Sequence, residues 1–183
     1  MKFYREITLK DGRKCILRSA ESSDAEAFLD YFEKAHGETD FLCTYPDETA
    51  HNVEKEEKIL EETLGSDGSI EICAFVGGRL VGSAGKDAGR GREKKRPRAE
   101  NGVSIIKEFW GLGIGGELTK ACIECAKEAG YRQLELDVVS ENERAISLYR
   151  KFGFVEYGRN PRAFRTRDGR WQELVLMRLE IDP

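Results

Sequence analysis

Short apolar segments recur along the chain, and turn residues separate most of them. They run over residues 3–9, 14–17, 70–76, 79–84, 103–106, 134–139, 154–158 and 171–179, and we interpret them as strands. The first two flank Asp11-Gly12 and the next two flank Gly77-Gly78, residue pairs that tight two-residue turns favour. The pattern therefore predicts two β-hairpins.

Four other segments are predicted to be helices. Two of them open with capping-box patterns, at 23–26 and 140–143. The first of these ends at His36-Gly37, and the residues it is expected to bury are Ala27, Phe28, Tyr31 and Phe32. The second presents on one face Ala145, Leu148, Tyr149 and Phe152. A charged helix is expected over 52–64. The helix over 115–129 has an apolar face and stops at Gly130.

The order of these elements predicts an α/β (α+β) fold. We expect a mixed, mostly antiparallel central sheet of about six to seven strands, with helices on both faces. Residues 103–139 run strand, glycine-rich turn, helix and strand, so the two strands are expected to be parallel neighbours. The arginine-rich residues 159–170 are expected to connect the last two strands.

Composition limits the class of protein. The chain has 183 residues, 39% of them apolar, enough for one good core, and we expect a single domain over 1–183. The apolar runs are short and Met1–Glu6 does not resemble a hydrophobic leader, so we expect neither a membrane span nor a signal peptide. The expected protein is soluble and cytoplasmic, with its oligomeric state open and a homodimer among the alternatives.

The five cysteines are expected to be reduced. Cys122 and Cys125 have the spacing of a metal or redox pair, but there is no second pair, and His36 and His51 are far away in sequence. We therefore interpret both cysteines as core residues and expect no metal.

Charge is unevenly distributed around a net value of −4. Residues 90–98 carry six basic side chains against Glu93, whereas residues 21–62 carry fourteen acidic side chains against three lysines. A basic tract can contact nucleic acid, but in an acidic chain we interpret this one as a solvated loop between strands.

The most informative stretch is Phe109-Trp-Gly-Leu-Gly-Ile-Gly-Gly-Glu-Leu118. Its glycines leave backbone amides unshielded at a helix N-terminus, which suits an anion. A dinucleotide is one alternative, because Gly111-x-Gly113-x-x-Gly116 fits that fingerprint and Glu135 and Asp137 follow about 20 residues later. A turn without a ligand is another. A P-loop is excluded, because its lysine motif is missing.

Together with Glu141-Asn-Glu-Arg-Ala-Ile-Ser-Leu-Tyr-Arg-Lys-Phe-Gly-Phe154, this stretch resembles the two signature segments of the GNAT superfamily of acetyl-CoA-dependent N-acetyltransferases. Residues 16–24 resemble that family's first strand and helix. The resemblance implies acetyl transfer from acetyl-CoA to a primary amine by direct attack in a ternary complex. One departure is Trp110, where the family usually has Arg or Gln. A non-catalytic acyl-CoA-binding module on the same fold is the alternative.

The resemblance also implies roles for individual residues. The cofactor-binding set would be Ser104, Ile105, Ile106, Trp110, Gly111, Leu112, Gly113, Ile114, Gly115, Gly116 and Asn142. Within it, the amides of 112–116 would hold the pyrophosphate, 104–106 would lie beside the pantetheine arm, and a backbone N–H near Ile106 would polarise the thioester. Tyr149 would protonate the departing thiolate, and Glu100 would act as base, with Glu135, Asp137 or a water chain as competitors.

The amine acceptor is expected beside the segment that joins the first two helices, residues 38–49. Its Asp40, Asp47 and Glu48 would form an acidic rim, which favours a small-molecule or peptidyl amine with extra positive charge. The arginines of 159–170 would instead suit the 3′-phosphate of coenzyme A or an anionic acceptor, so both alternatives stay open. No membrane or nucleic-acid partner is expected.

Overall fold

The computed structural model describes the chain except residues 49–51, 89–93, 95–96 and 182–183. The strands are β1 (Tyr4–Thr8), β2 (Lys14–Ser19), β3 (Ile70–Val76), β4 (Arg79–Ala88), β5 (Arg98–Ile105), β6 (Gln133–Val139), β7 (Val155–Arg165) and β8 (Trp171–Glu180). The helices are α1 (Ala25–Gly37), α2 (Val53–Leu64), α3 (Ile114–Glu128) and α4 (Glu143–Lys151). Most of the basic tract at 90–98 lies outside the described residues.

Within the described residues, the strands form one sheet in the order β1-β2-β3-β4-β5-β6-β8-β7. All neighbours are antiparallel except β5 and β6, as the strand–turn–helix–strand pattern predicted. The sheet has eight strands rather than the expected six to seven, because β2 pairs with β3 and so adds the N-terminal hairpin to one edge.

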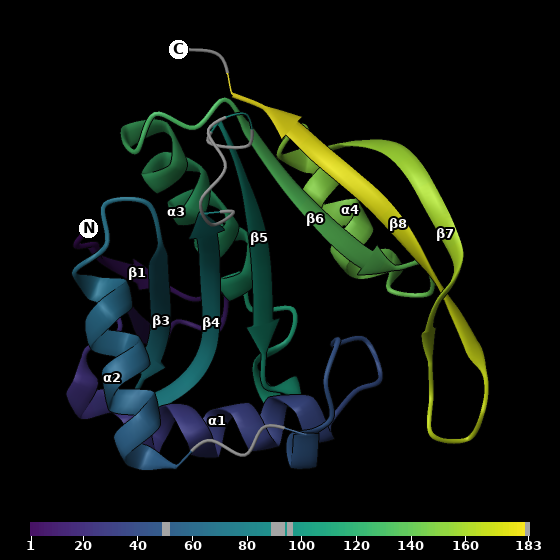
Figure 1. The fold of residues 1–183 in the computed structure, drawn as a ribbon. Coiled ribbons are helices and arrows are strands. Elements are labelled where there is room, and N and C mark those ends of the chain that lie inside the picture. The colour runs from purple at the N-terminus through teal and green to yellow at the C-terminus, as the bar shows by residue number, and fades with distance from the viewer. Residues whose placement is uncertain (49–51, 89–93, 95–96, 182–183) are drawn as a thin grey trace.

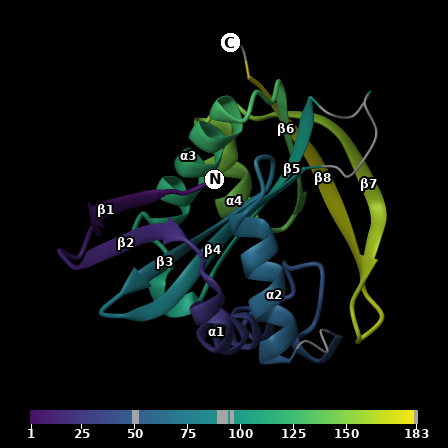
Figure 2. The same cartoon turned by 60° about the vertical axis from the view of Figure 1, so that its left-hand side comes forward.

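The helices cover both faces of the sheet, as predicted. Helices α1 and α2 pack on β4 and β3 from one side, and α3 packs on β3, β4 and β5 from the other. Figure 2 shows the pairs α1/α2 and α3/α4 on opposite sides. The buried face of α3 includes Cys122 and Cys125, so their interpretation as core residues is confirmed.

The parallel neighbours β5 and β6 pair only at one end. Their register joins Arg98 to Gln133, Ala99 to Leu134 and Glu100 to Glu135. Beyond these pairs the two strands diverge, and Figure 1 shows β6 leaning away from β5. The divergence leaves the amides of the second half of β5 without a strand partner on that side, which creates the place for a ligand.

Four local predictions are wrong. The box before α1 is formed by Glu21 and Asp24, whose carboxylate accepts the Glu21 N–H at 2.8 Å, so Ser23 and Glu26 do not make it. Ala27 is exposed; α1 buries Ala25, Tyr31 and Ala35 instead.

Helix α4 is capped by Asn142, whose Oδ1 accepts the Ala145 N–H at 3.2 Å, and not by a box from Ser140. The expected connection at 159–170 is mostly strand, because β7 continues to Arg165 along β8 with two register shifts.

Candidate active site

A pocket of about 360 Å³ lies where β5 and β6 diverge. The end of β5, the glycine turn and the first turns of α4 form its walls, and the loop after α1 closes one side. The lining includes Lys10, Thr39, Phe41, Leu42, Val103, Ser104, Ile105, Trp110, Gly111, Gly113, Gly115, Gly116, Asn142, Arg144, Ser147, Leu148, Tyr149 and Lys151. Nine of these were expected from the sequence as site residues, and they come from three separate segments.

The glycine turn has a backbone that other residues rarely adopt. Gly111 and Gly113 have φ of +82° and +102°, and Gly113 is the N-cap of the 15-residue helix α3. A Cβ on Gly115 would lie 3.3 Å from Ile105 Cδ1 and 3.4 Å from Leu148 Cδ2. The glycines therefore serve two purposes: they shape the turn, and they let α3 approach β5 and α4 closely.

Three cationic side chains line the same pocket: Lys10, Arg144 and Lys151. With the positive end of the α3 dipole, they make the environment favourable to a polyanion. The residues present thus fit a diphosphate-containing ligand. Sequence reasoning missed these cations, because each approaches the turn only through tertiary structure; Lys10 does so by donating its backbone N–H to the Leu112 carbonyl at 3.2 Å.

Trp110 has two partners within the site. Its Nε1 donates to the Ile105 carbonyl at 2.7 Å, and the Arg144 guanidinium lies 4.1 Å from its ring centroid. The indole therefore packs and also fixes the end of β5. Arg144 thus supplies a positive charge beside Trp110.

A polarising amide is expected near Ile106, but the N–H of Ile106 itself is already used. Its N–H donates to the Val81 carbonyl on the β4 side at 3.0 Å. Because successive residues of a strand direct their amides to opposite neighbours, Val103 and Ile105 direct theirs away from β4, into the divergence. Ile106 and Ile114 are buried in the core, and neither these two nor Leu112 is part of the pocket lining.

Asn142 and Tyr149 reach the pocket from α4. The Asn142 Oδ1 accepts the Ala145 N–H, so this side chain acts as the N-cap of α4. Tyr149 is 6% exposed and packs on Phe154, and burial raises the pKa of its hydroxyl to about 12. A hydroxyl with that pKa stays protonated at neutral pH, so the proton is present, but burial makes the hydroxyl a weaker acid than a free tyrosine.

The three acidic candidates lie outside the pocket lining. Glu100 is exposed on β5, and Glu135 is held by Arg98 at 2.5 Å. Partial burial, followed by the charge of Glu135, raises the pKa of Asp137. Ser104 is the nearest polar side chain of β5 to the pocket, and its Oγ lies 2.5 Å from the Tyr31 hydroxyl.

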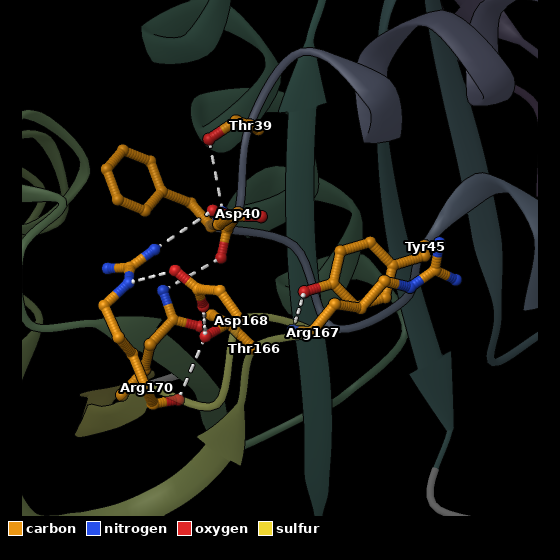
Figure 3. A network of polar contacts seen from close by, with 9 residues as sticks. Thr39, Asp40, Tyr45, Thr166, Arg167, Asp168 and Arg170 are labelled. Atoms are coloured by element: carbon orange, nitrogen blue, oxygen red, sulfur yellow. Dashed lines mark hydrogen bonds and ion pairs between the residues drawn. The ribbon is translucent and has the colours of Figure 1, made fainter.

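The loop after α1 carries the expected acidic residues, but the β7–β8 hairpin neutralises two of them. Arg167 pairs with Asp47, and Arg170 Nη2 lies 3.5 Å from Asp40 Oδ2. The Tyr45 hydroxyl also accepts the Arg167 N–H at 3.1 Å. We call these contacts together the loop–hairpin contact, and Figure 3 shows the part of it that joins Arg170 to Asp40 and Arg167 to Tyr45.

A second pocket, of about 220 Å³, lies between this loop and the hairpin. Thr39 and Leu42 line both pockets, so the two are adjacent. The Gln172 side chain, which donates to the Asp40 carbonyl at 3.1 Å, helps to enclose the second pocket. An acceptor entering here would meet the first pocket near the end of β5.

Among the described residues, no helix is long and apolar enough to cross a membrane. The same part of the chain has no group of three or more His, Cys, Asp or Glu side chains arranged to hold a metal ion.

Residues 25–154 match the acetyltransferase (GNAT) family. An enzyme of Pseudomonas aeruginosa, named L-methionine sulfoximine/L-methionine sulfone acetyltransferase, is 26% identical over 91% of this chain and 95% of its own. A GNAT-family acetyltransferase of Streptococcus pneumoniae is 30% identical, with a TM-score of 0.88 over 91% of this chain and 99% of its own. The Salmonella typhimurium protein yncA, solved with acetyl-CoA, shares the fold, with a TM-score of 0.80 at 22% identity over 91% and 94% of the two chains.

Proposed function

Because this chain belongs to the GNAT family of acetyltransferases, we propose that it moves an acetyl group from acetyl-CoA to the amine of an amino acid or of a close amino-acid derivative. The observation that carries the proposal is the pocket at the β5–β6 divergence, with a glycine-capped helix N-terminus at one end and a buried tyrosine in its wall. When bound, acetyl-CoA supplies the activated acyl group.

The turn and its cations would hold the phosphates. Gly111, Gly113, Gly115 and Gly116 line the pocket at the start of α3, and Lys10, Arg144 and Lys151 add positive charge. The Gly116 N–H already donates to the Gly113 carbonyl at 3.1 Å, so within 112–116 the amides of residues 112–115 would contact the phosphates. Trp110 and Gly111 shape the turn, and Asn142 lies on the opposite wall. Ser104 and Ile105 end β5 and Ile106 follows them, and the pantetheine arm would run beside these three residues.

Two groups of the chain would promote the chemical step. The free N–H of Ile105 or Val103 would donate to the carbonyl oxygen of the acyl group and stabilise the charge that develops there. Tyr149, kept protonated by burial, would donate its proton to the departing thiolate.

Glu100 is proposed as one acceptor of the amine proton. It lies on the same face of β5 as Ser104, four residues earlier, so the two Cα atoms are about 13 Å apart along the strand. At that distance Glu100 would act through ordered water, with Glu135 and Asp137 further from the pocket lining.

The acceptor class rests on the second pocket and on the Pseudomonas relative. Because Asp40 and Asp47 are already paired with arginines, the loop offers less attraction to a highly cationic amine than its composition suggested. The relative is named for two derivatives of methionine. A pocket lined by Leu42, Phe164 and Thr166 has the mixed apolar and polar surface that such a compound requires.

Release of free thiol from acetyl-CoA tests the proposal. We expect turnover with free L-amino acids or with methionine sulfone, none with the N-acetylated form of the same compound, and slower turnover with the analogue that lacks the carboxylate. Binding of acetyl-CoA without thiol release for any amine would favour the non-catalytic module. Failure to bind acetyl-CoA would contradict both.

A further inference from the structure

A row of polar side chains crosses the face of the sheet that α1 covers. Ser83 of β4 is paired in register with Cys73 of β3 on one side and with Ser104 of β5 on the other. Glu71 lies two residues before Cys73 and therefore on the same face. Tyr31 of α1 packs onto this row and is 4% exposed, while Ser83 is 7% exposed.

Neighbouring members of this row interact with one another. The Tyr31 hydroxyl donates to the Ser104 carbonyl at 2.8 Å, and its oxygen lies 2.5 Å from Ser104 Oγ. The Ser83 hydroxyl lies close enough to Tyr31 and to the carboxyl of Glu71 to lower the pKa of each. Ser104, Tyr31, Ser83 and Glu71 therefore form one series of neighbouring polar side chains.

The two ends of the series open into different pockets. Ser104 lines the active-site pocket. Glu71 lines a separate pocket of about 190 Å³ between α1 and α2, together with Glu56 and Thr63. The Glu71 carboxylate lies over Gly85, where any Cβ would overlap its Oε2. Because Gly85 has no side chain, the Glu71 carboxylate has room to lie over β4.

The surroundings of Glu71 favour its neutral form. Burial, and then the negative charge of Glu56 from α2, raise the pKa of Glu71 to about 7, against the opposing hydrogen bond from Ser83. The other titratable groups that face it are Tyr31 of α1 and the Cys73 thiol. The nearby Arg18 guanidinium is already bound to Asp24 at 2.6 Å.

We propose that Glu71 receives the proton that the acceptor amine must lose, through the relay Ser104, Tyr31 and Ser83. This inference rests on the proposed function and names the side chains through which the proton of the acceptor amine would pass. The acceptor ammonium would meet Ser104 at the active-site pocket, and Glu71 would release the proton to solvent through the pocket between α1 and α2.

The transfer conserves protons and involves no redox change. The ammonium N–H bond breaks and its proton passes to Ser104 Oγ, which gives its own hydrogen to the Tyr31 oxygen. Tyr31 turns its hydrogen from the Ser104 carbonyl to Ser83 Oγ, and Ser83 passes its hydrogen to the Glu71 carboxylate. One N–H bond is lost and one carboxyl O–H bond is gained, and the neutral amine is left able to attack.

The pH dependence of kcat/KM in Glu71→Gln tests the relay. The wild-type enzyme should lose activity below about pH 7, where Glu71 becomes protonated. In Glu71→Gln, kcat at pH 8 should fall about 100-fold and the acid limb should leave its wild-type position, with KM for acetyl-CoA unchanged. Glu57→Gln, an exposed neighbour on α2, is the matched control and should keep the wild-type profile.

Two further variants interrupt the relay without removing the carboxylate. Tyr31→Phe and Ser83→Ala should each lower kcat as Glu71→Gln does, and Ser83→Thr, which keeps a hydroxyl, should restore most of the rate. Thermal melts verify that each variant is folded.

The outcomes separate the inference from the proposed function. A wild-type protein with no thiol release contradicts the function itself. An active wild type whose Glu71→Gln variant keeps both rate and pH profile overturns the relay, as does loss of the acid limb only in Glu100→Gln. If Glu71→Gln is impaired but Tyr31→Phe and Ser83→Ala are not, the side-chain route is also overturned.

Discussion

At the scale of single residues, the position of Tyr149 in the pocket wall allows its proposed acid role to be tested directly. It is buried, lines the pocket and has a pKa raised to about 12 by burial. Tyr149→Phe should therefore lower kcat about 100-fold while KM for acetyl-CoA stays within twofold. Steady-state thiol release measures both. Tyr157→Phe, at an exposed tyrosine on β7, should be neutral; equal kcat in the two variants would remove the acid role.

The raised pKa of Glu71 also predicts how the stability of the protein depends on pH. A carboxyl whose pKa is raised from 4.5 to about 7 by folding holds a proton in the folded state that the unfolded state has lost. Stability should therefore decline as pH rises from about 4.5 to 7, by on the order of 3 kcal/mol.

Glu71→Gln should remove this decline and be the more stable protein at pH 8. Urea unfolding of wild type, Glu71→Gln and Glu57→Gln at pH 5 and pH 8 measures the difference. Parallel pH dependence in all three proteins would show that Glu71 is ionised like an exposed carboxylate.

At the scale of elements, the start of α3 depends on the conformation of Gly113. Its φ of +102° strains any residue with a Cβ, although a Cβ there would meet no other atom within 4 Å. Gly113→Ala should cost about 1–3 kcal/mol of stability and raise KM for acetyl-CoA, because the amides of the turn would be displaced.

Gly102→Ala is the matched control, since that glycine lies on β5 with equal space and no positive φ. Denaturant unfolding and acetyl-CoA saturation curves compare the two variants. A Gly113→Ala variant no weaker than Gly102→Ala would show that the turn tolerates other backbone conformations.

The elements that sequence predicted well are those fixed by local chemistry. The turns at Gly12 and Gly77-Gly78 have positive φ, and the helix expected near 52 begins with an Asn52 cap at Val53. The continuation of β7 through Pro161 could not be predicted from the sequence, because it depends on pairing with β8 at the sheet edge, where a proline is tolerated.

The site also divides into parts that local sequence predicts and parts that depend on contacts between distant residues. The glycine turn, Asn142 and Tyr149 belong to contiguous signature segments, so their convergence on one pocket was foreseeable from the resemblance. The contacts of Arg144 with Trp110 and of Tyr31 with Ser104 join residues 34 and 73 positions apart. Their spacing carries no periodic signal, and only the packed fold brings them together.

At the scale of the whole molecule, the pocket lies between two hydrophobic clusters. One includes Leu17, Ile72 and Leu118, and the other includes Leu136, Phe154 and Val175. The connections between them in the described part of the chain include the short β5–β6 pairing, the loop–hairpin contact and α3, which contributes Leu118 to the first cluster and Ala126 to the second. A ligand in the pocket would touch β5 on one side and α4 on the other.

Acetyl-CoA should therefore stabilise both halves of the molecule together. At 100 times its Kd it should add about 2.7 kcal/mol and raise Tm by roughly 5–10 °C. Hydrogen exchange should slow at residues 103–105 of β5 and at 143–149 of α4 alike, because the ligand bridges the divergence that the sheet leaves open. NAD, which also carries a pyrophosphate, is the control and should produce neither effect, since the described strands include one parallel pair, β5 and β6, rather than the series of parallel strands of a dinucleotide fold. Protection confined to residues 110–116 would mean that the phosphates bind while the pantetheine arm lies elsewhere, and the proposed roles of Ile105 and Tyr149 would then fail.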